Sequence, residues 1–314
     1  MKNAYVSAME SHGYDYQSMK TAVQNLLECL PRPLSSLVKR GDRVLLKPNL
    51  RHGSVRDPAT RLVSHPVFIQ CIVEALIDIG ARVVIGNEGS NTVSAYTARY
   101  HQHSLHALTE KTGAGLVNFY VAGASAVRSG FIYPRNYWVT NAALDSDFIV
   151  NCGNAQPHPQ FIFSGAVKNM FNVLVGDTQN RLSIIFRHPR DLARIVASVC
   201  KTIHPGLSLL DMTTVYVPVP HAVPRPIGLI LASEDPVALD TVAVEILGYG
   251  NERIWTSHHG QQIGLGCASL FNIKVNGADI TSNPARNIPL PTTYQPSQER
   301  VYEKITRLIN ATVL

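Results

Sequence analysis

The chain has 314 residues, of which 45% are hydrophobic and only 16% are charged. This balance excludes intrinsic disorder as a general description, because disordered chains are poor in apolar residues and rich in charge. The net charge is +6, from 28 Lys and Arg against 22 Asp and Glu. The basic residues are dispersed rather than gathered into a stripe with aromatic residues, so the composition argues against a nucleic-acid partner.

The sequence contains no membrane or export signal of the usual kinds. No run of about 18 apolar residues occurs anywhere in it, and Glu10, His12 and Asp15 lie where a signal peptide needs its apolar stretch. We therefore expect a cytoplasmic protein without a membrane partner. The five cysteines are far apart and form no C-x-x-C pair, so no Fe–S cluster is expected.

Buried strands and helices alternate from residue 43 onward. The run RVLLKPNL predicts a strand that ends near Pro48, and Pro66 and Gly80 bound a predicted helix. Residues 82–86 predict a second buried strand. A strand, a helix and a strand of these lengths form a βαβ unit, whose strands are parallel.

The alternation continues to about residue 249. We predict strands at 116–119, 147–151, 208–212 and 227–232, and helices at 102–113, 164–174, 189–203 and 236–247. Ser164 and Asp235 are the predicted caps of two of these helices. The pattern predicts an α/β fold with a mainly parallel sheet, helices on both faces and repeated βα units, with room for two lobes around a crevice. Residues 1–280 would form this domain, and residues 281–314 a C-terminal strap and amphipathic helix packed on it.

In such sheets ligands bind outside the carboxyl ends of the strands, which directs attention to Lys47 and to the helix that follows Gly165. Lys47 can act as a fixed positive charge for a phosphate or carboxylate. The alternative is a strand-end lysine paired with a carboxylate. Lys168 and Asn169 lie near a helix N-terminus, where free N–H groups favour an anion. The alternative for Lys168 is a stem that lies along apolar surface.

Three further residues are candidates for proton transfer or metal binding. His158 lies in a loop between two prolines and can donate or accept a proton, although a turn histidine can equally bond the backbone. Glu88 follows a strand in GNEGSN and suits a divalent metal or a substrate amine or hydroxyl. Asp235 precedes Pro236 and is favoured as a helix cap over a metal ligand.

Six segments in order resemble the landmarks of the DUF362 family: VLLKPNL, ALIDIGARVVIGN, DFIVN with GAVKNMFNVLVG, LSLLDM, ASEDPVALDTVAVEILGY, and GLG with a closing IKVNG. The resemblance implies a fold more than an activity. In the family pattern a PKLKTH stretch follows the DFIVN strand, and alignment places Asn154 and Gln156 at its two lysines and His158 at its histidine. Some relatives have a cysteine-rich ferredoxin-like segment that holds Fe–S clusters. Because this sequence has no such cysteine-rich segment, we do not expect it to share their redox role.

These observations favour an enzyme of small-molecule, specialised biosynthetic metabolism. Its substrate would be a phosphorylated, diphosphorylated or carboxylated anion. No G-x-G-x-x-G or P-loop motif occurs, so no nucleotide cofactor is expected, and lyase, cyclase, isomerase or transferase chemistry is favoured over hydride transfer. The catalytic candidates are His158, Lys168 and Glu88, the substrate-binding candidates are Lys47, Asn49, Asn154, Gln156 and Asn169, and Asp235 is the candidate ligand for Mg²⁺ or Mn²⁺.

Two alternatives of other classes stay open. One is a redox protein whose Fe–S cluster or electron partner lies on another chain. The other is a noncatalytic binding or assembly protein. A homodimer is compatible with each of these interpretations.

Overall fold

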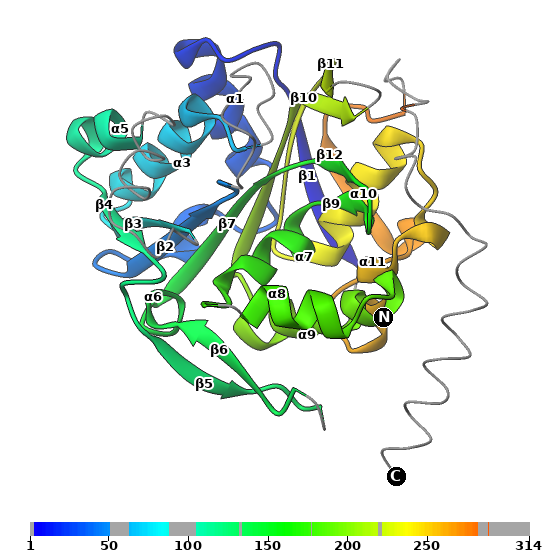
Figure 1. Cartoon of the computed structure of the whole chain (residues 1–314). Helices are drawn as coiled ribbons and strands as arrows, with labels where there is room; N and C mark the ends of the chain where they lie inside the picture. The colour runs from blue at the N-terminus through cyan, green and yellow to red at the C-terminus, as the bar shows by residue number, and fades with distance from the viewer. Residues whose placement is uncertain are drawn as a thin grey trace, which may run out of the picture.

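An eight-stranded sheet forms the centre of the protein, in the order β12-β1-β11-β10-β7-β2-β3-β4 (Figure 1). The computed structural model describes residues 3–50, 63–87, 105–131, 134–176, 178–218, 222–281 and 288. The strands of this sheet are β1 (Ala4–Glu10), β2 (Arg43–Pro48), β3 (Arg82–Asn87), β4 (Gly115–Asn118), β7 (Phe148–Asn154), β10 (Leu207–Pro218), β11 (Ala222–Ser233) and β12 (Ile273–Gly277). Two small hairpins accompany it: β5 (Ala124–Arg128) with β6 (Asn136–Thr140), and β8 (Gln156–His158) with β9 (Ile162–Ser164).

Most neighbouring strands of the sheet are parallel. The pairs β1–β12, β10–β7, β2–β7, β2–β3 and β3–β4 are parallel. Only β11 runs antiparallel to both of its neighbours, β1 and β10. The predicted α/β class with a mainly parallel sheet is therefore confirmed.

Helices cover both faces of the sheet (Figure 1). One face carries α1 (Tyr16–Glu28), α3 (Pro66–Asp78) and α5 (Leu105–Thr112), and the other carries α7 (Ala166–Asn169), α8 (Thr178–Ile185), α9 (Pro189–Ile203), α10 (Pro236–Leu247) and α11 (Trp255–Gln262). Short helical turns are α2 (Leu34–Leu37), α6 (Asn141–Leu144) and the 3-10 turns Met170–Val173, Asn251–Arg253 and Leu270–Asn272. In the part of the chain that the structure describes, no helix is long and apolar enough to span a membrane.

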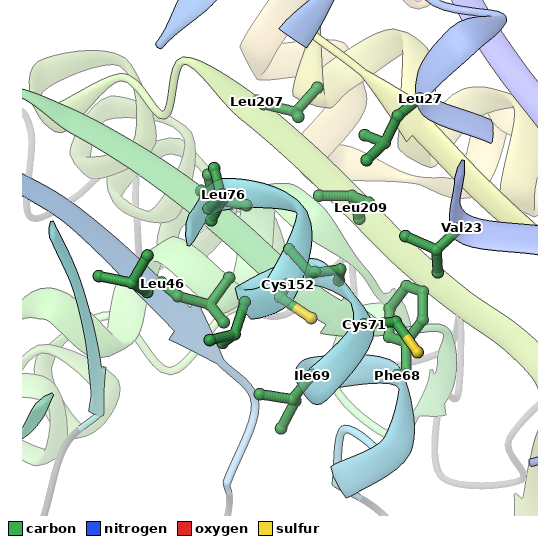
Figure 2. Close-up of a cluster of buried hydrophobic side chains, with 14 of the residues drawn as sticks. Val23, Leu27, Leu46, Phe68, Ile69, Cys71, Leu76, Cys152, Leu207 and Leu209 are labelled. Atoms are coloured by element: carbon green, nitrogen blue, oxygen red, sulfur yellow. The ribbon is translucent and has the colours of Figure 1, made fainter. Parts of the chain in front are cut away.

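Alternation along β2 and β7 divides the core into two sides. Leu46 and Cys152 point toward α3 and pack with Phe68 and Leu76 (Figure 2). On the other face, Leu45 belongs to the core that contains α9. Because successive side chains of a strand point to opposite faces, Lys47 lies on the α7 and α9 face together with Leu45.

Local signals explain the predicted elements that agree with the structure. Pro66 and Pro236 occupy first turns, and Asp235 caps α10 through N–H groups of Val237 and Ala238. Gly248 ends α10 with φ +75°, a left-handed conformation that glycine adopts without strain.

Two predictions differ from the structure. The helix expected at 164–174 is a single α-turn followed by a 3-10 turn, and its cap is Gly165, because Ser164 belongs to β9. Strands β10 and β11 are much longer than expected, because they pair with each other from Ser208 and Ser233 to Pro218 and Ala222. Glu88 and most of the predicted C-terminal strap lie outside the described residues.

Candidate active site

The parallel ends of β2, β7 and β10 bring polar residues into register. Lys47 lies opposite Asn151, and Asn151 lies opposite Ser208. Further toward the carboxyl ends, Asn154 lies opposite Asp211. The strand-end rule used on the sequence therefore led to residues that are neighbours in the structure.

Lys47 is fully buried in a polar layer between the sheet and α7. Its Nζ donates to Oδ1 of Asn169 at 3.0 Å. Asn169 in turn donates through Nδ2 to Oδ1 of Asn151 at 2.8 Å, and Asn151 donates to the carbonyl of Ala166 at 2.9 Å. Buried polar groups need such partners, because an unpaired one carries the full cost of desolvation. Lys47 and Asn169 thus tie α7 to the sheet.

A second amide pair lies at the carboxyl ends of the same strands. Nδ2 of Asn49 donates to Oδ1 of Asn154 at 2.8 Å. The backbone N–H of Asn49 donates to Oγ of Ser64, and this hydroxyl donates to the carbonyl of Cys152 at 2.8 Å. Asn49 and Asn154 are both buried. The hydrogen bonds of Asn49 fix the path of the backbone directly after β2.

Asp211 receives a hydrogen bond from a distant part of the chain. The hydroxyl of Tyr14 donates to Asp211 at 2.9 Å, and the N–H of Thr213 donates to the other oxygen at 2.9 Å. Burial raises the pKa of Asp211, while these bonds oppose the rise. Burial and the nearby carboxylate also raise the pKa of Tyr14, so its phenol stays protonated and donates. The ring of Tyr14 stacks on His65 with centroids 3.7 Å apart.

The β8–β9 hairpin carries Gln156 and His158, both buried. Nδ1 of His158 accepts from the backbone N–H groups of Gln160 and Phe161 at 3.1 and 3.3 Å. An Nδ1 that accepts hydrogen bonds leaves the proton of the neutral ring on Nε2. The hairpin places Ile162 at φ +67°, a conformation that is strained for a β-branched residue and that occurs mainly where surrounding structure enforces it.

The ring of Phe161 contacts two of the predicted catalytic residues. His158 contacts it with centroids 5.1 Å apart, and Nζ of Lys168 lies 5.6 Å from its centroid. Nζ of Lys168 also lies 4.9 Å from the ring of Phe171. A cation over an aromatic face is attracted by the ring's quadrupole, so the two rings orient the half-buried Lys168. His158 and Lys168 therefore share Phe161 as a neighbour.

The start of α7 does not offer free N–H groups. The carboxylate of Asp240, on α10, accepts from the N–H of Ala166 at 2.6 Å and from that of Val167 at 3.0 Å. We expected an anionic ligand to accept hydrogen bonds from these N–H groups. In the structure the side chain of Asp240 accepts them instead. Lys168 is left as the positive group of this turn.

Asp235 does not join the other candidates. Strand β11 is antiparallel to β10, so Ser233 lies opposite Ser208 and the chain continues toward the amino-terminal ends of β7 and β10. The carboxylate of Asp235 accepts from three N–H groups, those of Val237, Ala238 and Cys267, which is a capping role. Among the described residues, no three His, Cys, Asp or Glu side chains are grouped to hold a metal ion. Glu88 lies outside those residues.

Sequence reasoning missed several residues that shape the site. Phe161, Phe171, Tyr14 and Asp240 act through contacts between segments distant in sequence, and no local pattern marks them. The strand-end rule does point to Asn151, which follows the apolar run DFIV and lies opposite Lys47.

Comparison with known proteins places the chain in a family. The model described as "Domain of unknown function (DUF362)" matches residues 44–245. The chain belongs to the DUF362 family. The matched range contains Lys47, the β8–β9 hairpin, α7 and Asp240, whereas Tyr14 lies before it.

Two individual proteins are similar to this chain. The thylakoid-associated protein sll1697 of Synechocystis sp. is 26% identical over 264 residues, which cover 83% of this chain and 79% of that protein. The structure of the lactate racemase apoprotein from Thermoanaerobacterium thermosaccharolyticum aligns with a TM-score of 0.50 at 13% identity. The alignment covers 79% of this chain but only 58% of the racemase chain. At this identity the likeness concerns the α/β fold alone.

Proposed function

We propose that this DUF362 protein is an enzyme that binds a small phosphorylated, diphosphorylated or carboxylated anion at the carboxyl ends of β2 and β7 and acts on it by acid–base or leaving-group chemistry. The observation that supports the proposal is the ring of Phe161, which both His158 and the ammonium group of Lys168 contact. A positive charge and a hydrogen-bond donor that share a neighbour suit a reaction in which negative charge develops on a substrate oxygen.

Each group has a distinct task in this proposal. Lys168 neutralises the anion, and His158 donates a hydrogen bond from Nε2–H to the substrate oxygen on which negative charge develops, because two backbone N–H groups occupy Nδ1. Asn49, Asn154 and Gln156 offer amide donors and acceptors that orient the substrate. Lys47 contributes by holding Asn169 and α7 rather than by touching the substrate.

The reaction class that follows is acid–base or leaving-group chemistry, as in a lyase, cyclase, isomerase or transferase. A divalent ion would enter with a diphosphate substrate, since Mg²⁺ is commonly bound through substrate phosphates and few protein carboxylates. Strain at Ile162, directly after the turn that holds His158, supports a functional role for this hairpin.

A thermal-shift series on the metal-stripped whole chain tests the proposal. Orthophosphate, pyrophosphate, malate and citrate are each added with and without Mg²⁺ or Mn²⁺, to wild type, Lys168→Ala and Lys168→Arg. A ligand present at 100 times its Kd stabilises the folded state by about 2.7 kcal/mol, which raises Tm by several degrees. We expect one anion class to give this rise in wild type, a smaller rise in the arginine variant and none in the alanine variant.

The control is Lys39→Ala, which also removes one positive charge. Lys39 is exposed and precedes the amino end of β2, at the other end of the sheet from the site. The Lys39 variant should keep the wild-type shift. Equal shifts in wild type and Lys168→Ala, or no shift with any anion, would refute the proposed site and favour a partner-dependent or noncatalytic role.

A further inference from the structure

Asp240 lies far from Lys168 in sequence but contacts the turn that carries it. The Asp240 side chain is buried, and each carboxylate oxygen accepts one N–H group of α7, from Ala166 at 2.6 Å and from Val167 at 3.0 Å. A helix leaves its first N–H groups without partners inside the helix. Because α7 is a single turn of four residues, these two bonds fix much of its backbone.

The residue before the turn leaves no space between α7 and this carboxylate. A Cβ atom on Gly165 would lie 2.2 Å from Oδ1 of Asp240 and 2.5 Å from the ring of Phe163. Such approaches are far below van der Waals contact, so only glycine fits. The start of α7 is pressed directly onto Asp240.

The far end of the turn is held by different partners. Asn169 bonds to Lys47 and Asn151 on the sheet. Lys168 lies between the two anchored ends, and its ammonium group lies over Phe161 and Phe171. Any rotation of α7 at its start would therefore move the ammonium relative to these rings.

We propose that Asp240 is a positioning residue: by accepting two N–H groups at the start of α7, it fixes the turn that presents Lys168 at the candidate active site. The role in anion binding rests on the proposed function, whereas the positioning of Lys168 does not. The same carboxylate makes the helix start a closed site, so an anion is directed to the ammonium of Lys168 instead of to the backbone.

NMR of the whole chain tests positioning directly. The ε-methylene protons of Lys168 should be shifted upfield by the rings of Phe161 and Phe171 in wild type. Asp240→Asn keeps the shape of the side chain but replaces one acceptor oxygen by an amide donor that faces an N–H group. We expect this variant to lose most of the upfield shift and to exchange the Ala166 and Val167 amide protons at least about tenfold faster, as expected for loss of a buried hydrogen bond.

Two further variants make the result decisive. Glu245→Gln removes a carboxylate from the same helix, and no hydrogen bond of its side chain is described, so it should behave as wild type. Gly165→Ala keeps the carboxylate but forces α7 away from it, so it should reproduce the loss of the Lys168 shift even where Asp240→Asn folds poorly. Wild-type shift and amide exchange in a folded Asp240→Asn variant, or a wild-type Lys168 shift in Gly165→Ala, would overturn the proposal.

An anion titration separates this proposal from the previous one. Pyrophosphate and malate are added to wild type and Asp240→Asn, with chemical-shift changes of Lys168 as the readout. Weaker binding by the variant supports both proposals. If neither anion binds wild type while Asp240→Asn still displaces Lys168, the anion site is wrong and the positioning role stands.

Discussion

Replacing Asp240 with asparagine is expected to change how the stability of the protein depends on pH. Burial raises the pKa of this carboxyl from 3.8 to about 7, and the neighbouring carboxylate of Asp235 adds to the rise. The folded protein therefore keeps a proton on Asp240 in a pH range where the unfolded chain has released it. The stability that results is fully present below pH of about 4 and is lost as the pH rises through about 7.

The size of the effect follows from the difference between the two pKa values. It corresponds to on the order of 4 kcal/mol in total, of which about 3 kcal/mol falls between pH 5 and pH 8. Asp240→Asn has no proton to lose at this position. The free energy of unfolding of wild type minus that of the variant should therefore be about 3 kcal/mol larger at pH 5 than at pH 8.

Urea unfolding at a series of pH values, followed by tryptophan fluorescence, measures this difference. Asp211 and Asp235 also have pKa values raised by burial. The contribution of Asp211 cancels in the subtraction, whereas Asp235 interacts with Asp240, so the measured difference belongs to this pair of carboxyls. Glu245→Gln serves as the control and should follow wild type at every pH. A difference that is constant from pH 5 to pH 8, or that grows with pH, would show that the two N–H groups outweigh burial and keep Asp240 ionised.

Two further outcomes are expected at the same site. Lys47→Met keeps the length of the buried chain but leaves Oδ1 of Asn169 without the Lys47 donor, so urea unfolding should show a loss of about 1–3 kcal/mol; a variant as stable as wild type would contradict the role of Lys47 in holding α7. His158 should carry its proton on Nε2 at neutral pH. Its ¹⁵N chemical shifts report the tautomer, and a proton on Nδ1 would contradict the assigned hydrogen bonds.

Much of the fold could be predicted because its helix boundaries are set by local chemistry. α3, α9 and α10 begin at prolines, and α10 ends at a glycine with positive φ. These signals act within a few residues. The direction of β11 could not be read in this way, because its antiparallel pairing with β10 depends on partners across the sheet.

Part of the candidate site could likewise be predicted from local sequence, and part depends on residues distant in the chain. Lys47, Asn49 and Asn154 lie at the ends of predicted strands. Their closeness in space could be predicted, because parallel strands end at the same edge of the sheet. The short α7 could not be predicted, because Asp240 sets its start from another helix. Asp235 was expected near the site for a related reason, since the expectation assumed that every strand ends on the same side of the sheet.

The amides at the carboxyl end of β7 bear on the kind of anion that the proposed site would bind. The resemblance to the family pattern implies that Asn154 and Gln156 replace two lysines, and Asn154 accepts a hydrogen bond from Asn49. Amides offer orientation without charge, whereas each lysine would add a positive charge near the ligand. Among the described residues of this cluster, Lys47 is buried against Asn169 and Lys168 is the half-buried cation. A carboxylate carries less charge than a diphosphate, so within the proposed substrate classes a carboxylate should bind better than a diphosphate that lacks its metal ion.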